Sequence, residues 1–490
     1  MEQNQLYNIL IGTCNLFKGV LDTRDYKRYI LAFFFFKYIC DNGSDKKESK
    51  PGEPCVRFYI PKDAHFNNLY KFADDPEFAN EITNALNKVE SCNESLRGIF
   101  SNVEFSGEIF KSERHTLQTL YNSFAELDLK STDETREKIV SAFLMLLNFF
   151  SLNEGKKGGE MNTPPEIAKL LSELIQPKQH DSIYDGACGA STLILQVADS
   201  IVKGSPTDLS IYGQDINEEA IRISKMQILI NGLDKNVQNF KQGNIFTSPQ
   251  FTNENDLKKF DIVVSHPPFS LNRWNPVAPK YDPYNRFHRG IPPMSKGDYA
   301  FISHMIESAK EATGKIGIIA SHGVLFRGAS EYDIRKSLIE ENLLEAVIGL
   351  PPNIFPGTSI SGVILIFNKG KKDNSDVLFI DASNHYLTGR MLNRLKNEDI
   401  EAIVNIYKQY EQKGKIKSEN LGEDWKGFAR VVQYKEIVEN DFNLNIPRYI
   451  DTFEEVEEID IDLLKKEISD IEKELVSVQA KIKGILKELA

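Results

Sequence analysis

Four consecutive residues, His266, Pro267, Pro268 and Phe269, have the types and the spacing expected of a site for a planar base. They follow an apolar segment, Phe260 to Val264, that is typical of a buried strand, so they are expected at the carboxyl edge of a sheet, where α/β sites lie. The prolines would fix the backbone and leave its carbonyls free to accept hydrogen bonds, and Phe269 would offer a stacking face. The pattern by itself equally predicts a rigid loop with Phe269 in the core.

A stretch of small residues, Asp185-Gly-Ala-Cys-Gly-Ala-Ser191, is predicted to form a turn between a strand and a helix that begins near Thr192. Small side chains let the backbone approach a ligand, and a helix N-terminus has free N–H groups, although such turns are also ordinary α/β architecture. Gly213-Gln-Asp215 ends the next predicted strand, where an acid can accept both hydrogen bonds of a ribose diol. Asn244, after the third unit, is expected at the edge of an adenine or in a plain turn. These strand ends together predict a nucleoside site.

A nicotinamide dinucleotide fits these residues poorly. The Gly-x-Gly-x-x-Gly fingerprint is absent, and Asp215 follows the turn at Asp185 by about thirty residues, longer than the usual twenty. A nicotinamide enzyme is therefore disfavoured.

The elements that must position these residues form an α/β pattern, because short apolar runs typical of strands alternate with helical segments from residue 183 on. The predicted strands are Ser182–Tyr184, Leu209–Tyr212, Phe260–Val264, Ile316–Ala320, Glu345–Ile348 and Gly362–Phe367. Strands that alternate with helices predict a doubly wound sheet.

Two helical regions are expected on either side of the α/β region. Residues 4–152 carry apolar positions at helical spacing and predict an all-helical N-terminal domain, and the polar, Gly- and Lys-containing stretch 153–159 is the expected linker. From Ile461 to Leu489, apolar residues recur three and four apart as in a coiled coil, so another helix, of this chain or of a partner, is expected to cover this seam. The expected domains are residues 1–152, 153–450 and 451–490.

The composition indicates a soluble globular protein of about three domains, with 490 residues of which 41% are apolar and 27% charged. A net charge of −12 argues against a protein that wraps nucleic acid unaided. Five cysteines without a Cys-x-x-Cys pair indicate a reducing compartment. The beginning of the chain has no signal-peptide pattern, and its longest apolar run, Tyr29 to Phe36, is too short to span a membrane. We therefore expect a cytoplasmic protein.

The chain resembles, nearly end to end, the modification (M) subunits of type I restriction-modification systems, which are gamma-class N6-adenine DNA methyltransferases. Besides the Asp185 turn and the Pro-Pro-Phe loop, the motifs that carry the resemblance are Asp25-Tyr-Lys-Arg28, Gly155-Lys-Lys-Gly-Gly-Glu160 followed by Thr163-Pro164, Tyr212-Gly-Gln-Asp-Ile-Asn217, Lys296-Gly-Asp-Tyr-Ala-Phe301, His322-Gly-Val-Leu-Phe-Arg-Gly328, Asn342-Leu-Leu-Glu-Ala-Val-Ile-Gly-Leu-Pro351 and Asn443-Leu-Asn-Ile-Pro-Arg448. The resemblance implies a Rossmann-like methyltransferase fold, S-adenosyl-L-methionine as the cofactor and double-stranded DNA with a flipped adenine as the substrate.

The resemblance also implies roles for particular residues and assigns none of them to a metal. The residues implied to bind the cofactor are Glu160, Met161, Asn162, Thr163 and Pro164 at its methionine end, Asp185, Gly186, Cys188, Gly189, Ala190 and Ser191 at its amino acid part and ribose, Asp215 at the ribose hydroxyls and Asn244 by the adenine. The residues implied to hold the target base are His266, Pro267, Pro268 and Phe269.

This sequence departs from the family pattern at several of these positions. The family has Asn at the position of His266, where an amide oxygen accepts one hydrogen of the adenine amino group; neutral His has one acceptor nitrogen and protonated His has none. Loss of one positioned acceptor would cost a factor of about a hundred to a thousand in rate. Gly186 replaces Pro, Ser191 a Gly, Asn244 an Asp, and Met161-Asn162 an aromatic pair. A Cβ at Ser191 is expected to crowd the cofactor.

Two functions follow from the sequence and both stay open. In the first, the chain is the catalytic methyltransferase subunit. In the second, it is a catalytically impaired M-like subunit that acts as a DNA-clamping scaffold, with His266 either natural or engineered. In both, the resemblance implies assembly of two M subunits with one specificity subunit through the C-terminal heptads, with or without a restriction subunit. The recognised DNA sequence lies in another chain.

Overall fold

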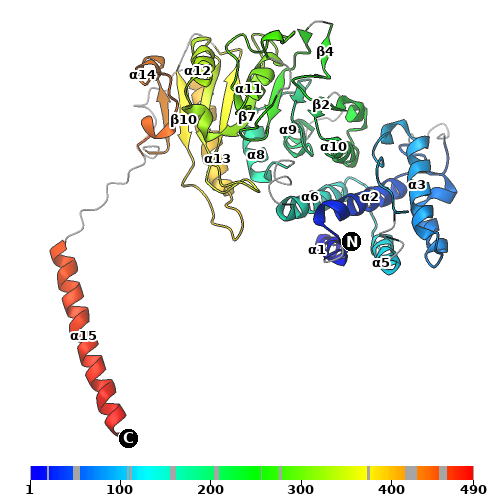
Figure 1. Ribbon diagram of the computed structural model, residues 1–490, viewed down its shortest axis with the longest axis horizontal. Helices are drawn as coiled ribbons and strands as arrows, with labels where there is room; N and C mark the ends of the chain where they lie inside the picture. Colours follow the sequence, from blue (N-terminus) through cyan, green and yellow to red (C-terminus); the bar gives the residue numbers. More distant parts are fainter. Residues whose placement is uncertain are drawn as a thin grey trace.

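The computed structural model describes residues 2–18, 21–47, 56–107, 110, 113–154, 162–202, 209–254, 256–274, 279–371, 376–413, 427–451 and 461–488. It has a helical N-terminal region, an α/β region built on one large sheet, and a long C-terminal helix (Figure 1). Within the described ranges, no helix combines the length and the apolar character that a membrane crossing requires.

The N-terminal region is helical, as the sequence predicts. Its helices are α1 (Gln3–Leu16), α2 (Thr23–Asp41), α3 (Phe78–Cys92), α5 (Arg114–Ala125) and α6 (Arg136–Asn153). Four successive phenylalanines of α2, Phe33 to Phe36, are all buried, so this helix is covered on every side. No strand is assigned in the described residues before α6 ends.

One sheet of nine strands forms the centre of the α/β region, in the order β11-β10-β8-β9-β7-β6-β1-β2-β3. The strands are β1 (Ser182–Asp185), β2 (Ser210–Asp215), β3 (Phe240–Gln242), β6 (Ile262–Ser265), β7 (Lys315–Ser321), β8 (Leu344–Gly349), β9 (Gly362–Asn368), β10 (Val377–Asp381) and β11 (Ala429–Val432). A separate hairpin joins β4 (Thr252–Asn253) to β5 (Asp256–Leu257). The predicted doubly wound α/β fold is confirmed, and each of the six predicted strands overlaps an observed one.

The sheet is mixed, because β9 is antiparallel to both of its neighbours, β7 and β8, and β11 is antiparallel to β10. The chain between β8 and β9 contains no helix among residues 350–361, and a parallel neighbour requires a crossover connection, usually helical. Because this connection is short, β9 pairs with β8 in the antiparallel direction.

Helices cover both faces of the sheet. Successive side chains along a strand point to opposite faces, so they belong to two different hydrophobic clusters. In β9, Ile364 and Ile366 join one hydrophobic cluster, while Val363 and Leu365 join the other. The helices of the α/β region are α8 (Pro165–Ile175), α9 (Thr192–Val202), α10 (Glu218–Ile230), α11 (Asp298–Glu307), α12 (Ser330–Glu340), α13 (Asn397–Lys413) and α14 (Tyr434–Glu439). Helices α8, α9 and α13 contribute to the first cluster, which continues into the N-terminal region, and α11 and α12 to the second (Figure 1).

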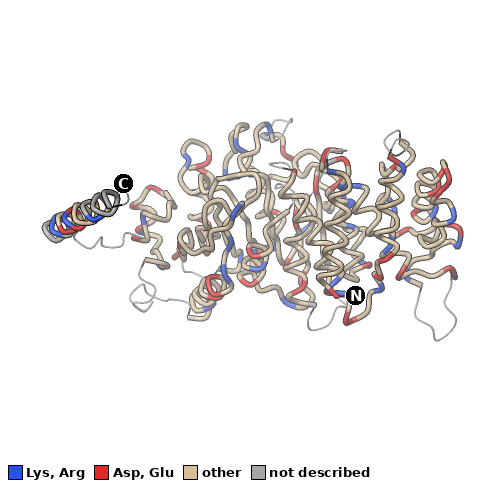
Figure 2. The backbone as a smooth tube through the Cα atoms, turned by 90° about the horizontal axis from the view of Figure 1, so that it is seen from below, with Lys and Arg blue, Asp and Glu red and all other residues tan. Residues whose placement is uncertain are grey.

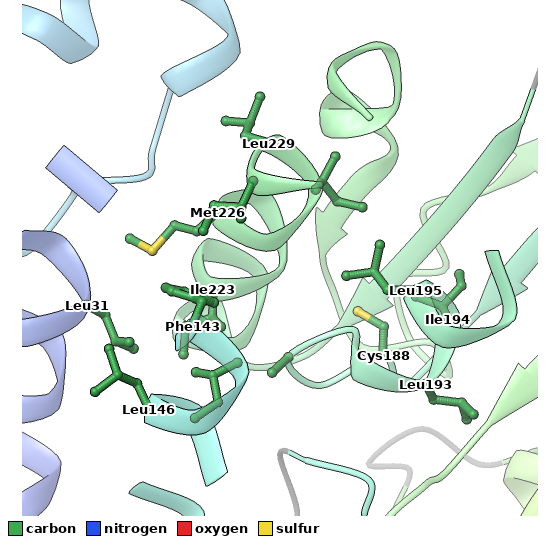
Figure 3. Close-up of a cluster of buried hydrophobic side chains, with 14 of the residues drawn as sticks. Leu31, Phe143, Leu146, Cys188, Leu193, Ile194, Leu195, Ile223, Met226 and Leu229 are labelled. Atoms are coloured by element: carbon green, nitrogen blue, oxygen red, sulfur yellow. The ribbon is translucent and has the colours of Figure 1, made fainter. Parts of the chain in front are cut away.

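The N-terminal helices dock on α10 through apolar side chains. Phe143 and Leu146 of α6 lie opposite Ile223 and Met226 of α10 in the close-up of this cluster (Figure 3). Cys188, in the turn after β1, belongs to the same cluster. The turn that is predicted to hold a ligand is therefore part of the continuous core that joins the two regions. Of the five cysteines, Cys14, Cys40, Cys92 and Cys188 are free thiols, and Cys55 lies outside the described residues.

The C-terminal heptad segment is helical, as predicted, and forms α15 (Ile461–Glu488). The apolar residues of the heptad seam whose side chains are described are exposed: Ile468, Ile471, Leu475, Val478 and Ile482. Acidic and basic residues are interspersed along this helix and over the folded body (Figure 2). The stripe on α15 is thus an apolar surface without a cover among the described residues.

Candidate active site

Four of the predicted site residues lie at the carboxyl ends of four neighbouring strands. Strands β6, β1, β2 and β3 are parallel and adjacent. Asp185 ends β1 and Asp215 ends β2, while Asn244 follows β3 and His266 follows β6. Because parallel strands end at one edge, these four residues, which lie far apart in the sequence, come to the same edge of the sheet.

The turn after β1 is tied to the end of β2 by two backbone hydrogen bonds. The N–H of Gly189 donates to Oδ2 of Asp215 at 2.9 Å, and the N–H of Cys188 donates to the carbonyl of Gln214 at 3.0 Å. Ser191 has a φ of 67°, in the left-handed region where glycine is the usual residue. Its hydroxyl donates to Ser224 of α10 at 2.7 Å and is fully buried. The side chain of Ser191 therefore packs against α10.

A cavity of about 270 Å³ lies at this edge of the sheet. Its walls are Gly186, Ala187, Gly189, Asp215, Ile216, Asn217, Gly243, Asn244, Ile245, Phe246, Pro268, Leu271, Trp274 and Phe301. Five of the predicted site residues are on this wall: Gly186, Gly189, Asp215, Asn244 and Pro268. Cys188, Ala190 and Ser191 are not, because they face the core beneath the turn. The wall thus combines an acid, backbone groups and aromatic faces.

Asp185 is a buried carboxylate with one free oxygen. Its Oδ1 accepts from the N–H of Ala187 at 2.9 Å and from the hydroxyl of Ser265 at 2.8 Å. Burial raises the pKa of Asp185 from 3.8 to about 7, the charge of Asp215 adds to this rise, and the two hydrogen bonds oppose it. Its Oδ2 has no hydrogen-bond partner among the described residues and is not sealed from solvent. A cationic group on a ligand would find an unpaired oxygen there.

Asp215 is partly buried. Burial raises the pKa of Asp215 above 3.8, and N–H groups of Asn217 and Gly189 oppose the rise. Its two oxygens accept these bonds at 2.8 and 2.9 Å, one each. Each carboxylate oxygen has a second acceptor position, so Asp215 can still accept from a pair of ligand hydroxyls.

His266 is a partly exposed imidazole that lies between two aromatic rings. Its ring centroid is 5.4 Å from that of Phe269 and 4.9 Å from that of Phe355. Its Nδ1 lies 3.1 Å from Oγ1 of Thr163. Loss of solvation among these groups lowers the pKa of His266 from 6.5 to about 4, so the ring is neutral at pH 7.

The segment before α8 connects the helical region to the turn after β1. Asn162 donates to Asn148 of α6 at 2.6 Å and accepts from the hydroxyl of Thr192 at 2.6 Å. Asn162 and Pro164 line a second hollow, beside Ile354, rather than the cavity described above. Two further predicted residues, Glu160 and Met161, lie outside the described residues.

Several residues that the sequence patterns did not single out support the site. Arg286 is buried and donates to the carbonyls of Ile245 at 2.6 Å and Phe246 at 2.9 Å, and so holds one wall of the cavity. The aromatic wall itself, Phe246, Trp274 and Phe301, comes from two loops and from α11. For Phe301 the sequence signal is the motif Lys296 to Phe301 of the family resemblance, which indicated no role for this ring.

Asp298, at the start of α11, supports the end of the Pro-Pro-Phe loop. It is buried, and it accepts from the N–H of Ser270 at 3.2 Å, the hydroxyl of Ser321 at 2.8 Å and the guanidinium of Arg327 at 2.9 Å. These contacts connect the chain after Phe269 to β7 and to the segment beyond it. In the part of the chain that is described, no group of three or more His, Cys, Asp or Glu side chains could hold a metal ion.

The same residues can be compared with known proteins. The sequence profile described as "N-6 DNA Methylase" matches residues 134–458, and the profile described as "HsdM N-terminal domain" matches residues 6–124. The type I restriction enzyme MjaVII methylase subunit of Methanocaldococcus jannaschii is 30% identical to this chain over 94% of this chain and 82% of its own length. This chain belongs to the methylase subunits of type I restriction enzymes.

Other relatives agree with this assignment. The type I restriction enzyme MpnII methylase subunit of Mycoplasma pneumoniae is 27% identical to this methylase. The alignment covers 96% of this methylase and 94% of the Mycoplasma protein. The crystal structure of the type I restriction-modification system methyltransferase subunit from Streptococcus thermophilus superposes with a TM-score of 0.80 at 28% identity, over 92% of this methylase and all of that chain. The methylase therefore shares both sequence and fold with this family along nearly its full length.

Proposed function

We propose that this methylase transfers a methyl group from S-adenosyl-L-methionine to N6 of an adenine in double-stranded DNA, and that a separate specificity subunit chooses the sequence. One observation carries the proposal: the cavity at the ends of β1, β2 and β3 has on its wall Asp215, Gly186 and Gly189 of the turn that follows Asp185, and Pro268 of the target loop. The family assignment supports the chemistry.

The described residues suit the chemical groups of this cofactor. S-adenosyl-L-methionine would supply a methyl group on positively charged sulfur, together with an ammonium group, a ribose diol and an adenine. Oδ2 of Asp185 is free for a cation, and Asp215 can accept from the diol. Phe246 and Trp274 would face the adenine, and Asn244, which is on the same wall, would lie at its edge. Gly186 and Gly189 would let the backbone approach the ligand.

Other predicted cofactor residues would act indirectly. Cys188, Ala190 and Ser191 would hold the turn in its left-handed conformation. Asn162 would fix the segment that carries Thr163 and Pro164 beside this turn. The roles of Glu160 and Met161 at the methionine end stay predictions from the resemblance.

The target loop would position the adenine for direct transfer. In this step the amino nitrogen forms the new N–C bond while the C–S bond breaks, and the amino group then loses one proton to solvent. The carbonyl of Pro267 would accept one amino hydrogen, and Phe269 would stack on the flipped base. His266, which is neutral at pH 7, stands where the second acceptor is needed.

Partners of this methylase are proposed from its surface. Residues 1–152 would form the helical domain, 153–450 the methyltransferase domain and 451–490 the assembly helix. The exposed apolar stripe of α15, which includes Ile471 and Leu475, would pack on helices of a specificity subunit, with two methylases per specificity subunit and with or without a restriction subunit. We also propose a cytoplasmic location, where DNA is accessible.

The test is isothermal titration of S-adenosyl-L-methionine into the full chain, followed by a methyl-transfer assay with the specificity subunit and DNA. Asp215→Asn is expected to weaken binding at least about tenfold, because an acceptor for a ribose hydroxyl becomes a donor. Asp256→Asn, an exposed acid of β5 outside the cavity, is the matched control and is expected to bind normally. Absence of binding by the unaltered chain would refute the proposal. Binding without transfer, restored in His266→Asn, would place the defect at that residue.

A further inference from the structure

Thr163 and His266 form an isolated pair of hydrogen-bonding side chains. Oγ1 of Thr163 lies 3.1 Å from Nδ1 of His266, and no other side-chain hydrogen bond involves either residue in the described ranges. The two residues are 103 positions apart, and they meet because Thr163 precedes α8 while His266 follows β6. Thr163 is 6% exposed, so its hydroxyl has little access to water.

Only one of the two possible directions of this hydrogen bond satisfies both residues. If Nδ1 carried the proton and donated it, the hydroxyl hydrogen of Thr163 would be buried without an acceptor, which is unfavourable. If the hydroxyl donates to Nδ1, its hydrogen is paired and the proton of the neutral ring is on Nε2. Nε2 is not among the buried atoms that lack a partner, so an N–H there can meet water or a ligand.

The surroundings of the ring support a single orientation. His266 lies between Phe269 and Phe355, with centroid separations of 5.4 and 4.9 Å. Neither phenyl ring supplies an acceptor that would favour a proton on Nδ1. The hydroxyl of Thr163 is therefore the group that selects the tautomer.

We propose that Thr163 holds His266 in the tautomer with its proton on Nε2, so that this position offers a target base a hydrogen-bond donor instead of an acceptor. This inference rests on the proposed function. An adenine amino group donates two hydrogens, and an N–H that faces it can accept neither. Thr163 is thus a positioning residue that slows methyl transfer to adenine, because it acts through the ring of His266.

The inference predicts that removal of a buried hydrogen bond speeds the reaction. Thr163→Val keeps the size of the side chain and removes the hydroxyl donor, so the hydrogen bond that holds the proton on Nε2 is lost and a donor at Nε2 can shift the ring to the other tautomer. We expect kcat to rise by about a hundredfold in His266→Asn, the lower end of the range for one preorganised hydrogen-bonding group, and by less, up to about tenfold, in Thr163→Val. Thr163→Ser, which keeps the hydroxyl, should behave as the unaltered chain.

The first measurement is a nitrogen-15 NMR spectrum of the full chain with labelled histidine, in which the signals of His266 are assigned by their loss in His266→Asn. Ring nitrogens with and without a proton have well-separated shifts. We expect Nδ1 of His266 without a proton in the unaltered chain and in Thr163→Ser, and partly protonated in Thr163→Val. A protonated Nδ1 in the unaltered chain would overturn the inference.

The second measurement is methyl transfer by the complex with the specificity subunit, with Thr163→Val made in both backgrounds. If Thr163 acts through the ring, Thr163→Val has no effect on kcat in the His266→Asn background. An equal loss in both backgrounds would show a merely structural role and would also overturn the inference. Absence of transfer by His266→Asn itself would refute the proposed function, whereas the NMR result on the tautomer would still stand.

Discussion

The buried carboxylate of Asp185 has an expected energetic cost that can be measured. Burial raises its pKa from 3.8 to about 7. Between these values the folded chain binds a proton that the unfolded chain has lost, so stability falls as the pH rises through this window. Above pH 7 the ionised carboxylate costs the folded state up to about 4 kcal/mol relative to the unfolded chain. Asp185→Asn removes this cost, and its amide oxygen can still accept from Ala187 and Ser265.

The assay is urea unfolding of both chains at pH 5 and pH 8. At pH 8 we expect Asp185→Asn to be more stable than the unaltered chain by about 2 to 4 kcal/mol, and at pH 5 we expect this advantage to be smaller by about 2 to 3 kcal/mol, because the folded carboxyl is then protonated. The same variant is expected to bind S-adenosyl-L-methionine less well, because it lacks the carboxylate that would pair with a cation. A gain in stability together with a loss of binding would show that the charge is kept for the ligand.

Asp261 provides a control of opposite sign. Burial tends to raise its pKa, but the hydrogen bonds from Lys310 and Ser182 outweigh burial and lower the pKa below 3.8. The ionised form of Asp261 therefore stabilises the fold, and Asp261→Asn is expected to lose stability at pH 8 without any effect on cofactor binding. If Asp185→Asn were no more stable than the unaltered chain at pH 8, the argument from burial would be refuted.

Three further substitutions test the packing of the chain. A Cβ at Gly213 would meet the ring of Phe240, so Gly213→Ala is expected to lower the free energy of unfolding by about 1 to 3 kcal/mol. Gly12→Ala, in open space on α1, should instead stabilise the chain by about 1 kcal/mol, and a similar loss in both variants under urea would contradict the packing argument. Arg57 donates two hydrogen bonds to Asp234 and so connects the helical region to the α/β region. Arg57→Met is expected to lower the free energy of unfolding by about 1 to 3 kcal/mol and to increase proteolysis at this contact. Unchanged proteolysis would show that the apolar contacts of α6 and α10 hold the two regions without this pair.

Much of the fold could be predicted from the sequence, because the periodicity of apolar residues reports how each segment is buried. The run Gly362–Phe367 and the heptads after Ile461 are examples, since each appears as the predicted element. The place of β9 between β7 and β8 could not be predicted in this way. The order of strands in a sheet depends on which distant segments pair, and the local pattern of apolar residues contains no information about this pairing.

The candidate site was also predictable in part. Asp185, Asp215 and His266 stand at strand ends, and the direction of parallel strands suffices to bring them to one edge. The aromatic wall was missed: Trp274 lies in a loop without a local signature, and Phe301 belongs to a motif of the family resemblance for which the sequence indicated no role. The expectation that Ser191 crowds a ligand rested on its type, whereas its hydroxyl is bonded to Ser224 on the side of α10.

The sequence by itself determined the alternation of strands and helices, the residues at the strand ends and the resemblance to a methylase family, since all of these depend on residue types and short spacings. Only the tertiary structure decided the state of the groups that would do the chemistry. The pKa of Asp185 depends on how much solvent the fold excludes, and the tautomer of His266 depends on a hydroxyl that is 103 residues away in the chain. Both properties arise from contacts between distant segments, so no local pattern can encode them.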